Sequence, residues 1–178
     1  MSMDNANTGP MYRLVTIVVA FVALLVLLSH AASARETIGY SAPYPAGSIV
    51  VYTNQRTLYF VLGNGAAVRY PVGVGRAGMA WHGRAFIARK HIRPSWGPPE
   101  DIWMRNPQLP AVIPGGSPRN PMGEAALGLD RGNYAIHGTN EPRSVGHFVS
   151  HGCIRMYNED ILDLYARTAV GTPVYVLP

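Results

Sequence analysis

Alternation of apolar and polar positions is the dominant pattern between Ser48 and Gly75. The segments "IVVYT" (49–53), "TLYFVL" (57–62) and "AAVRYPVGVG" (66–75) are rich in β-branched and aromatic residues, which is typical of strands. Gly63-Asn64-Gly65 separates the last two segments and predicts a hairpin turn. "GRAFIARK" (83–90) also alternates and predicts a fourth strand. No helical period of useful length occurs in this half, so we expect it to form a sheet.

The stretch from Pro94 to Pro121 breaks this pattern. It contains prolines at positions 94, 98, 99, 107, 110, 114, 118 and 121. Such a density is expected to exclude both a helix and a central strand. A disordered linker is one interpretation. We favour a lid or binding loop, because the stretch carries large apolar side chains that a linker rarely has, namely Trp96, Ile102, Trp103 and Met104.

The last third of the chain predicts two more strands, a loop, a helix and a closing strand. "EAALGL" (124–129) and "NYAIHG" (133–138) are the strands, and residues 139–156 are expected to be mostly loop. "NEDILDLYARTAV" is amphipathic and predicts the one good helix, with Asn158 as N-cap and Gly171 as its stop. "PVYVL" closes the chain. The fold class is therefore mainly β, with a strand order that the pattern does not give.

The first 34 residues have the pattern of a secretory signal peptide. Arg13 precedes a largely apolar run from Leu14 to Leu28, and Ala32-Ser33-Ala34 forms a small-residue cleavage site. The run is short for a spanning helix, which needs about 20 apolar residues, although an uncleaved anchor is the alternative. We therefore expect a signal over 1–34, a short linker over 35–47 and one domain over 48–178. The protein would be exported to the periplasm or cell envelope and would meet the membrane only through its N-terminal segment.

Composition agrees with one folded domain in 178 residues. Hydrophobic residues make up 48% and charged residues 14%, which suits a packed core. The formal net charge is +5 and comes almost wholly from arginine, because Lys90 is the sole lysine. This balance favours an anionic partner. Nucleic acid is not expected, since the sequence has neither a basic cluster nor a recognition-helix pattern.

Cys153, in "SHGCIRM" (150–156), is the only cysteine of the chain. Exported proteins usually pair their cysteines, so a lone one is buried and inert, intermolecular, or kept for its chemistry. A thiol nucleophile needs a base or a positive environment, because its ordinary pKa lies near 8.5. Three histidines are candidate bases. His137 ends a predicted strand, His151 shares one side of an extended segment with Cys153, and His147 is expected in an exposed loop.

The neighbours of Cys153 suit acyl transfer. Gly152 allows the amides of His151, Gly152 and Cys153 to approach a substrate carbonyl, and one such oxyanion donor is worth about 3–4 kcal/mol. Arg155 is suited to bind a substrate carboxylate with its planar fork. A buried structural cysteine and a zinc site made by Cys153, His151 and His137 are the alternatives. Zinc is disfavoured because no CxxC or HxxxH pair occurs, and we expect no metal or other cofactor.

"HGTN" (137–140) followed by "SHGCIRM" resembles the signature of the L,D-transpeptidases, the YkuD-type catalytic domain. The resemblance extends upstream through "YPVGVGR" (70–76) and "NPMG" (120–123), and covers roughly residues 48–178. It implies a β-sandwich-like domain that cross-links peptidoglycan stem peptides. It also implies that carbapenem β-lactams act as covalent inhibitors.

The same resemblance implies a role for each site residue. Cys153 would attack a donor tetrapeptide, release its terminal D-alanine and form a thioester, which an acceptor amine then takes. His137 matches the general base and the carbonyl of Gly138 its orienting partner. Arg155 lies where the family places an arginine near the substrate carboxylate. The residues that match the rest of the substrate pocket are Asn140, Ser150, His151 and Gly152.

One segment departs from the family pattern. Members usually have "TPTG" after the "VGVGR" strand, whereas this chain has "MAWHGR" (79–84) there. The departure bears on acceptor choice or loop geometry. Two other functions stay open, an L,D-carboxypeptidase in which water replaces the amine, and a non-catalytic peptidoglycan-binding module. A papain-type protease is disfavoured, because papain-type enzymes place the cysteine before the histidine.

Overall fold

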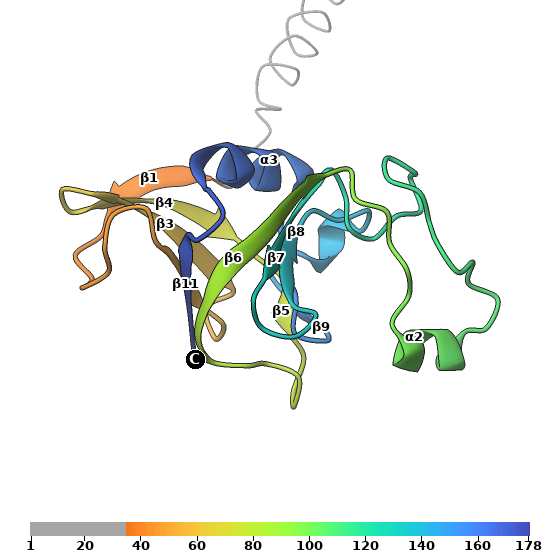
Figure 1. Ribbon diagram of the computed structural model, residues 1–178. Helices are drawn as coiled ribbons and strands as arrows, with labels where there is room; N and C mark the ends of the chain where they lie inside the picture. The colour runs from red at the N-terminus through yellow and green to blue at the C-terminus, as the bar shows by residue number, and fades with distance from the viewer. Residues whose placement is uncertain (1–34) are drawn as a thin grey trace, which may run out of the picture. The chain divides into compact units, whose positions relative to one another are not determined.

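The computed structural model of the protein describes residues 35–178, and the predicted signal segment lies outside that range. Within it, no helix is both long enough and apolar enough to cross a membrane. These residues fold as one compact unit built mainly from strands (Figure 1).

A nine-stranded sheet forms the body of this unit, in the order β1-β4-β3-β2-β11-β6-β7-β8-β10. Its strands are β1 (Glu36–Gly39), β2 (Ile49–Tyr52), β3 (Thr57–Gly63), β4 (Ala66–Pro71), β6 (Gly83–Ile92), β7 (Ala125–Leu129), β8 (Ala135–His137), β10 (Ile154–Arg155) and β11 (Pro173–Leu177). The pairs β2–β11 and β8–β10 are parallel, and the other pairs are antiparallel. A separate parallel pair is formed by β5 (Val74–Gly75) and β9 (Phe148–Ser150).

The long strand β6 belongs to both halves of the sheet. It pairs with β11 on one side and with β7 on the other, and its register with β7 shifts between Ile87 and Arg89. The helix α3 (Asn158–Arg167) packs on β7 and β8. One apolar cluster fills the space between these elements; its fully buried members include Leu58, Tyr70, Leu127, Ile136, Met156, Ile161 and Leu164. Each such aliphatic side chain contributes about 1.5–3 kcal/mol through burial.

The predicted fold class is confirmed, and the predicted strands in the first half are present at nearly the expected bounds. The hairpin turn between β3 and β4 is also confirmed. Gly63, Asn64 and Gly65 all have positive φ, at 86°, 50° and 71°. Such a run of left-handed residues suits glycine and asparagine, which explains why the turn was visible in the sequence.

The prediction that the proline-rich stretch excludes a helix is wrong. A short helix, α2 (Glu100–Arg105), lies within it. Pro98 and Pro99 immediately precede the helix, and Pro99 is its N-cap residue. The first turn of a helix leaves its N–H groups without intrahelical partners, so prolines just before it cost nothing. These prolines therefore delimit α2 and do not prevent it.

The segment 35–47, expected to be a short linker, contributes a strand. β1 pairs antiparallel with β4, and Glu36 lies opposite Arg69. Their side chains form an ion pair with 2.7 Å between Arg69 Nη2 and Glu36 Oε1. The four residues of β1 are too few and too polar to stand out as a strand before their partner is known.

The segment that carries α2 is closed at its base. Trp96 and Ile113 exchange two backbone hydrogen bonds, of 2.9 and 2.7 Å. The buried Asn120 donates from Nδ2 to the carbonyls of Pro94, Ile113 and Pro114, at 2.8–3.2 Å. Between these ties the chain projects beside the sheet (Figure 1, right). We call residues 97–112 the α2 loop.

Candidate active site

The turn around Cys153 is held from within by a buried serine. Ser150, at the end of β9, is only 2% exposed. Its hydroxyl donates to the carbonyl of Cys153 at 2.5 Å and accepts from the amide of Gly152 at 3.0 Å. Gly152 has φ +119°, a conformation that favours glycine. The amide of Gly152, one of three predicted oxyanion donors, is thus engaged inside the turn.

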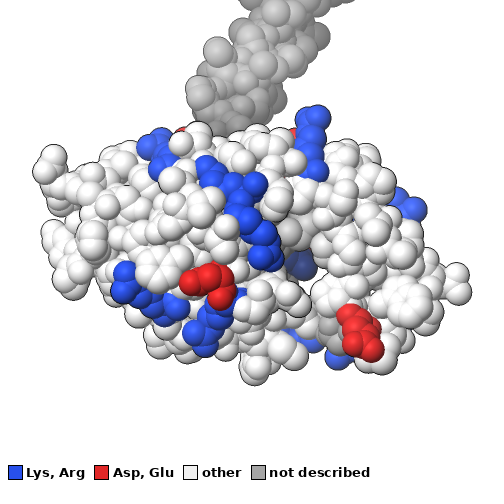
Figure 2. Space-filling view, in the orientation of Figure 1, with Lys and Arg blue, Asp and Glu red and all other residues white. Residues whose placement is uncertain are grey.

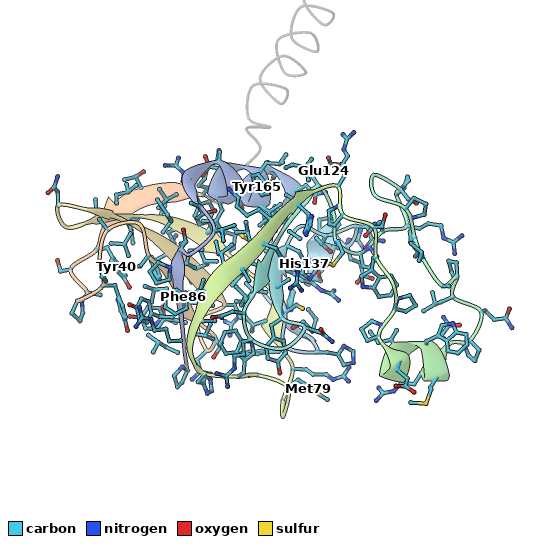
Figure 3. The ribbon with its side chains drawn as sticks, in the orientation of Figure 1. Tyr40, Met79, Phe86, Glu124, His137 and Tyr165 are labelled. Carbon is cyan, nitrogen blue, oxygen red and sulfur yellow. The ribbon has the colours of Figure 1, made fainter. Side chains whose placement is uncertain are left out.

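Strand pairing brings Cys153, His137 and Arg155 together. β10 runs parallel to β8, with Arg155 opposite His137. Cys153 immediately precedes β10, and its thiol interacts with the backbone of Ala135, two residues before His137 on β8. Arg155 lies close enough for its positive charge to act on both Cys153 and His137, although burial has the larger effect on the pKa of each. His137 lies near the β8–β10 edge of the sheet, on the side of the α2 loop (Figure 3), and the register of β8 with β10 brings Arg155 alongside it.

His137 is buried, and its tautomer is set by its neighbour. The distance between Nδ1 and the carbonyl oxygen of Gly138 is 2.6 Å. A carbonyl can only accept, so Nδ1 carries the proton and Nε2 the lone pair. Burial lowers the pKa of His137 to about 4, against the opposing effect of the Gly138 carbonyl. The imidazole is therefore neutral at pH 7, the state that a general base requires.

The thiol of Cys153 is also neutral at rest. Burial raises its pKa, and the backbone of Ala135 and the charge of Arg155 oppose that effect. Burying a charge is costly, so the neutral thiol and neutral imidazole are more stable at rest than a thiolate and an imidazolium would be. The thiolate then forms only when its proton moves to the base.

His151 is placed differently from His137. Its Nε2 lies 2.8 Å from Nη2 of Arg76, and a guanidinium only donates. The lone pair of this nitrogen is therefore already used, which argues against His151 as the base. His147 is exposed, as expected from the sequence.

Asn158 has a role that the sequence reasoning missed. We expected it to be the N-cap of the last helix; that prediction is wrong, because Tyr157 is the N-cap and α3 begins at Asn158. Its Oδ1 accepts from the amides of Glu124 and Thr139, and its Nδ2 donates to the carbonyl of Thr139 at 3.0 Å. A Cβ on Gly138 would lie 2.3 Å from Oδ1. Asn158 thus fixes the chain next to the carbonyl that orients His137.

The segment that departs from the family pattern contributes directly to the turn. Trp81 is buried, and its indole Nε1–H donates to the carbonyl of Gly152 at 2.9 Å. Its ring stacks on Tyr134, with 5.3 Å between centroids and 4° between planes. Sequence reasoning missed both aromatic residues. The only signal was the replacement of "TPTG" by a stretch containing tryptophan.

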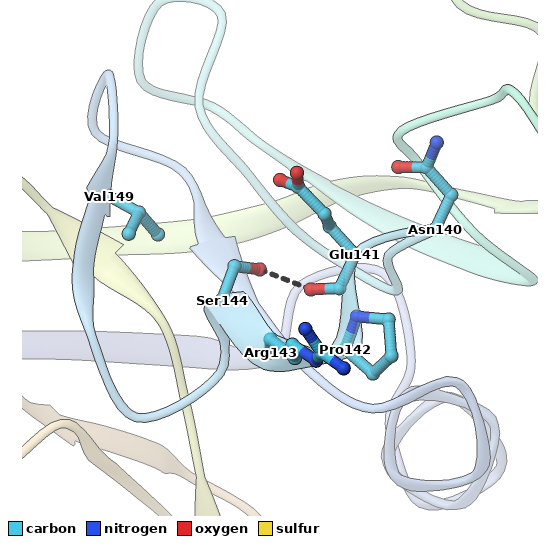
Figure 4. A pocket seen from close by; sticks show the side chains of 6 residues that line it. All are labelled: Asn140, Glu141, Pro142, Arg143, Ser144 and Val149. Carbon is cyan, nitrogen blue, oxygen red and sulfur yellow. Dashed lines mark hydrogen bonds between the residues drawn. The ribbon is translucent and has the colours of Figure 1, made fainter.

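A pocket of about 480 Å³ opens beside the site (Figure 4). It is lined by Asn140, Glu141, Pro142, Arg143, Ser144 and Val149. The Ser144 hydroxyl donates to the Glu141 carbonyl at 2.6 Å and holds this short 3-10 turn. Arg155 Nη1 lies 3.6 Å from Glu141 Oε2, so the predicted carboxylate-binding arginine already has a carboxylate partner at the pocket.

Basic side chains gather near the site on the surface. Figure 2 shows a band of Lys and Arg over β6, beside a hollow between the sheet and the lobe that contains α2. β6 carries Arg84, Arg89 and Lys90, of which Lys90 donates from Nζ to the carbonyls of Tyr165 and Thr168. Clustered positive charge attracts anionic partners over several ångströms. Among residues 35–178, no group of three or more His, Cys, Asp or Glu side chains is placed to hold a metal ion.

The fold and the site define a mainly β catalytic domain with a histidine at the end of β8 and a cysteine directly before β10, the parallel partner of β8. The family model for the YkuD L,D-transpeptidase catalytic domain matches residues 46–176. The chain therefore belongs to the L,D-transpeptidase catalytic-domain family, as the resemblance implied.

The chain is also similar to one named relative of this family and to a solved structure whose title names another activity. The chain is 38% identical over 136 residues to the probable L,D-transpeptidase YbiS of Escherichia coli. The aligned region covers 72% of this chain and 43% of YbiS. This chain thus spans less than half the length of that curated relative. A structure from Brucella melitensis, titled a probable carnitine operon oxidoreductase, is 35% identical, with a TM-score of 0.55 over 82% of this chain and 94% of that one.

The fold is also that of a mycobacterial enzyme. L,D-transpeptidase 3 of Mycobacterium tuberculosis, solved with a faropenem-derived adduct, superposes with a TM-score of 0.55 at 18% identity. The match covers 74% of this chain and 60% of that one. At this identity the likeness concerns the fold.

Proposed function

We propose that this protein is a peptidoglycan L,D-transpeptidase that works through a Cys153 thioester. The observation that supports the proposal is the pairing of β8 with β10, which joins the strand that ends at His137 to the strand that directly follows Cys153, while the imidazole is neutral. A base with its tautomer fixed by a third group, next to a nucleophile, is the arrangement that covalent acyl transfer requires.

The first half-reaction transfers the donor stem peptide to the enzyme. Cys153 Sγ attacks the carbonyl of the donor peptide bond as its proton moves to Nε2 of His137, and a C–S bond forms. The resulting oxyanion is stabilised by backbone amides of the turn at Cys153. Its collapse breaks the C–N bond, and the His137 imidazolium protonates the departing D-alanine amine.

The second half-reaction releases the acyl group. An acceptor amine attacks the thioester and gives a proton to His137, the C–S bond breaks, and the imidazolium returns the proton to the thiolate. With water as the attacking group, the same steps make an L,D-carboxypeptidase. Exclusion of water and binding of the amine decide between the two outcomes.

Substrate binding in this proposal uses the charges around the site. Arg155 binds a stem-peptide carboxylate, and the basic band over β6 suits a polymer that carries free carboxylates. Ser150 keeps the turn in shape, and Asn140 lies at the neighbouring pocket, where its Nδ2 donates to the carbonyl of Pro118 at 3.4 Å. The chemistry uses only side chains and backbone of the chain.

The location and the inhibitors follow from the same proposal. A secretory signal over 1–34, or an anchor there, would place the domain in the periplasm or cell envelope, beside its polymer. Carbapenems would acylate Cys153, because they present a strained carbonyl to the same thiol. The faropenem-derived adduct on the mycobacterial relative shows that an enzyme of this fold reacts with a β-lactam.

Mass spectrometry of purified tetrapeptide muropeptides incubated with the protein tests the proposal. We expect dimers that have lost one alanine, and none with Cys153→Ala. Tripeptide monomers alone would instead establish the carboxypeptidase. If the wild type forms neither product and is not acylated by meropenem, the protein is better described as a non-catalytic wall-binding module.

A further inference from the structure

The indole of Trp81 fixes the direction of the peptide bond that leads into the nucleophile. Its Nε1–H donates to the carbonyl of Gly152 at 2.9 Å, in a buried position. No peptide bond among the described residues is cis, so the N–H of Cys153 points opposite to the carbonyl of Gly152. The hydrogen bond from Trp81 to the Gly152 carbonyl therefore also sets the direction of the Cys153 N–H.

This peptide needs such a constraint because Gly152 is intrinsically free to rotate. A glycine at φ +119° has many accessible backbone conformations, and a different one would turn the Cys153 amide away from the substrate. The hydroxyl of Ser150 holds the amide of Gly152 on one side. Trp81 holds the carbonyl of the same residue on the other side, so the glycine is fixed at both ends.

The indole is itself held in one orientation. It stacks on Tyr134, and the guanidinium of Arg131 lies 5.1 Å from its ring centroid. Stacked aromatic pairs and cation–π contacts each favour a particular ring geometry. A Cβ on Gly152 would lie 2.3 Å from Cε1 of Tyr134. The aromatic pair thus packs directly against the turn as well as bonding to it.

We propose that Trp81 is a positioning residue for the oxyanion site, which aims the amide of Cys153 at the carbonyl under attack. This inference rests on the proposed acyl-transfer function. It assigns a purpose to the "MAWHGR" segment, which replaces the family's usual residues between β5 and β6. Loss of one whole oxyanion donor slows turnover by about 10²–10³-fold. Loss of its positioning alone should cost less, about 10- to 100-fold.

Two reactions of the same thiol separate positioning from folding. Acylation by meropenem passes through an oxyanion, whereas alkylation by iodoacetamide displaces iodide at a saturated carbon and forms none. In Trp81→Phe, which keeps a ring on Tyr134 but removes the N–H, we expect meropenem acylation to slow by about 10- to 100-fold. Alkylation should stay within about twofold of the wild type. Intact-protein mass spectrometry follows both.

Tyr70→Phe is the matched control, because it also deletes a donor of a side-chain hydrogen bond, to Asp163 at 2.5 Å, outside the turn. We expect wild-type rates for both reactions. Tyr134→Leu removes the stacking partner and keeps the indole, so a smaller loss confined to acylation is expected. If Trp81→Phe does not fold, Tyr134→Leu tests the positioning role of Trp81 in its place.

The opposing results are distinct. Equal slowing of both reactions in Trp81→Phe, or wild-type acylation, would overturn the role of Trp81. A wild-type protein that is alkylated at Cys153 but never acylated would overturn the proposed function, and with it this inference.

Discussion

His137 donates its Nδ1 proton to the carbonyl oxygen of the adjacent Gly138, 2.6 Å away. That bond leaves Nε2 as the proton acceptor, and burial lowers the pKa of the imidazole to about 4. Since the base is neutral far below pH 7, acylation of Cys153 should lose its base only when the pH falls toward 4.

Replacing His137 with glutamine should alter the pH dependence of stability. The folded pKa of about 4 lies below the ordinary value of 6.5, so the unfolded chain binds more protons between these values. The contribution of His137 is therefore present above pH 6.5 and is lost as the pH falls toward 4. It amounts to on the order of 3 kcal/mol. Urea unfolding at pH 7 and pH 4.5 should show the wild type losing stability relative to His137→Gln.

Asp160 supplies the control, because it acts in the opposite direction. Burial raises its pKa from 3.8 to about 6, so its contribution is present below 3.8 and is lost as the pH rises through 6. The two groups offset each other in the wild type between pH 4 and 6. In Asp160→Asn the loss on acidification should therefore become visible. Equal pH profiles for the wild type and His137→Gln would contradict the low pKa of His137.

Glu141→Gln should make Arg155 more available to anionic substrates. Glu141 is 75% exposed and its carboxylate lies 3.6 Å from the guanidinium. An exposed pair of this kind is worth up to about 1 kcal/mol, so meropenem acylation at low salt should quicken by about two- to fivefold. Added salt should reduce the gain. Glu36→Gln is the control, because it makes the same charge change at the Arg69 ion pair and should not alter the acylation rate. An unchanged rate in Glu141→Gln as well would show that Glu141 does not limit the access of substrate to Arg155.

Gly152→Ala should destabilise the fold more than a glycine replacement in open space. The new methyl group would lie 2.3 Å from the ring of Tyr134, in addition to adopting an unfavourable positive φ. Gly171 has φ +90° with nothing near its Cβ position, so Gly171→Ala isolates the backbone cost, about 1–2 kcal/mol. Overpacking should add about 1–3 kcal/mol at Gly152. Urea unfolding gives the free energy of unfolding of each variant. Equal losses of stability in the two variants would show that the turn at Gly152 can move to accommodate the methyl group.

Shortening the α2 loop should harm substrate binding more than folding. Trp103 and Met104 are 48% and 65% exposed, so removing them takes little from the core. A short Gly-Ser loop in place of residues 99–110 keeps the Trp96–Ile113 backbone pair and Asn120. We expect a nearly unchanged melting temperature and a higher KM for tetrapeptide muropeptides. Global unfolding of the shortened protein would show that the loop is structural.

The strands and the hairpin were predictable because their signals are local. Alternation in "TLYFVL" and "AAVRYPVGVG" reports one buried face, and Gly63-Asn64-Gly65 reports backbone angles that few other residues adopt. The fold class followed from these signals. The helix α2 did not, because the density of prolines says nothing of their positions, and prolines are harmless just before a helix.

The sequence by itself determined the strands, the lone thiol and, through two short motifs, the family. The tertiary structure decided which groups meet. β8 and β10 become parallel neighbours only in the folded sheet, and Trp81 reaches Gly152 across 71 positions of the chain. Asn158 likewise joins α3 to the chain beside His137. Such contacts leave no periodic trace in the sequence, because they depend on where distant segments pack and not on local backbone preference.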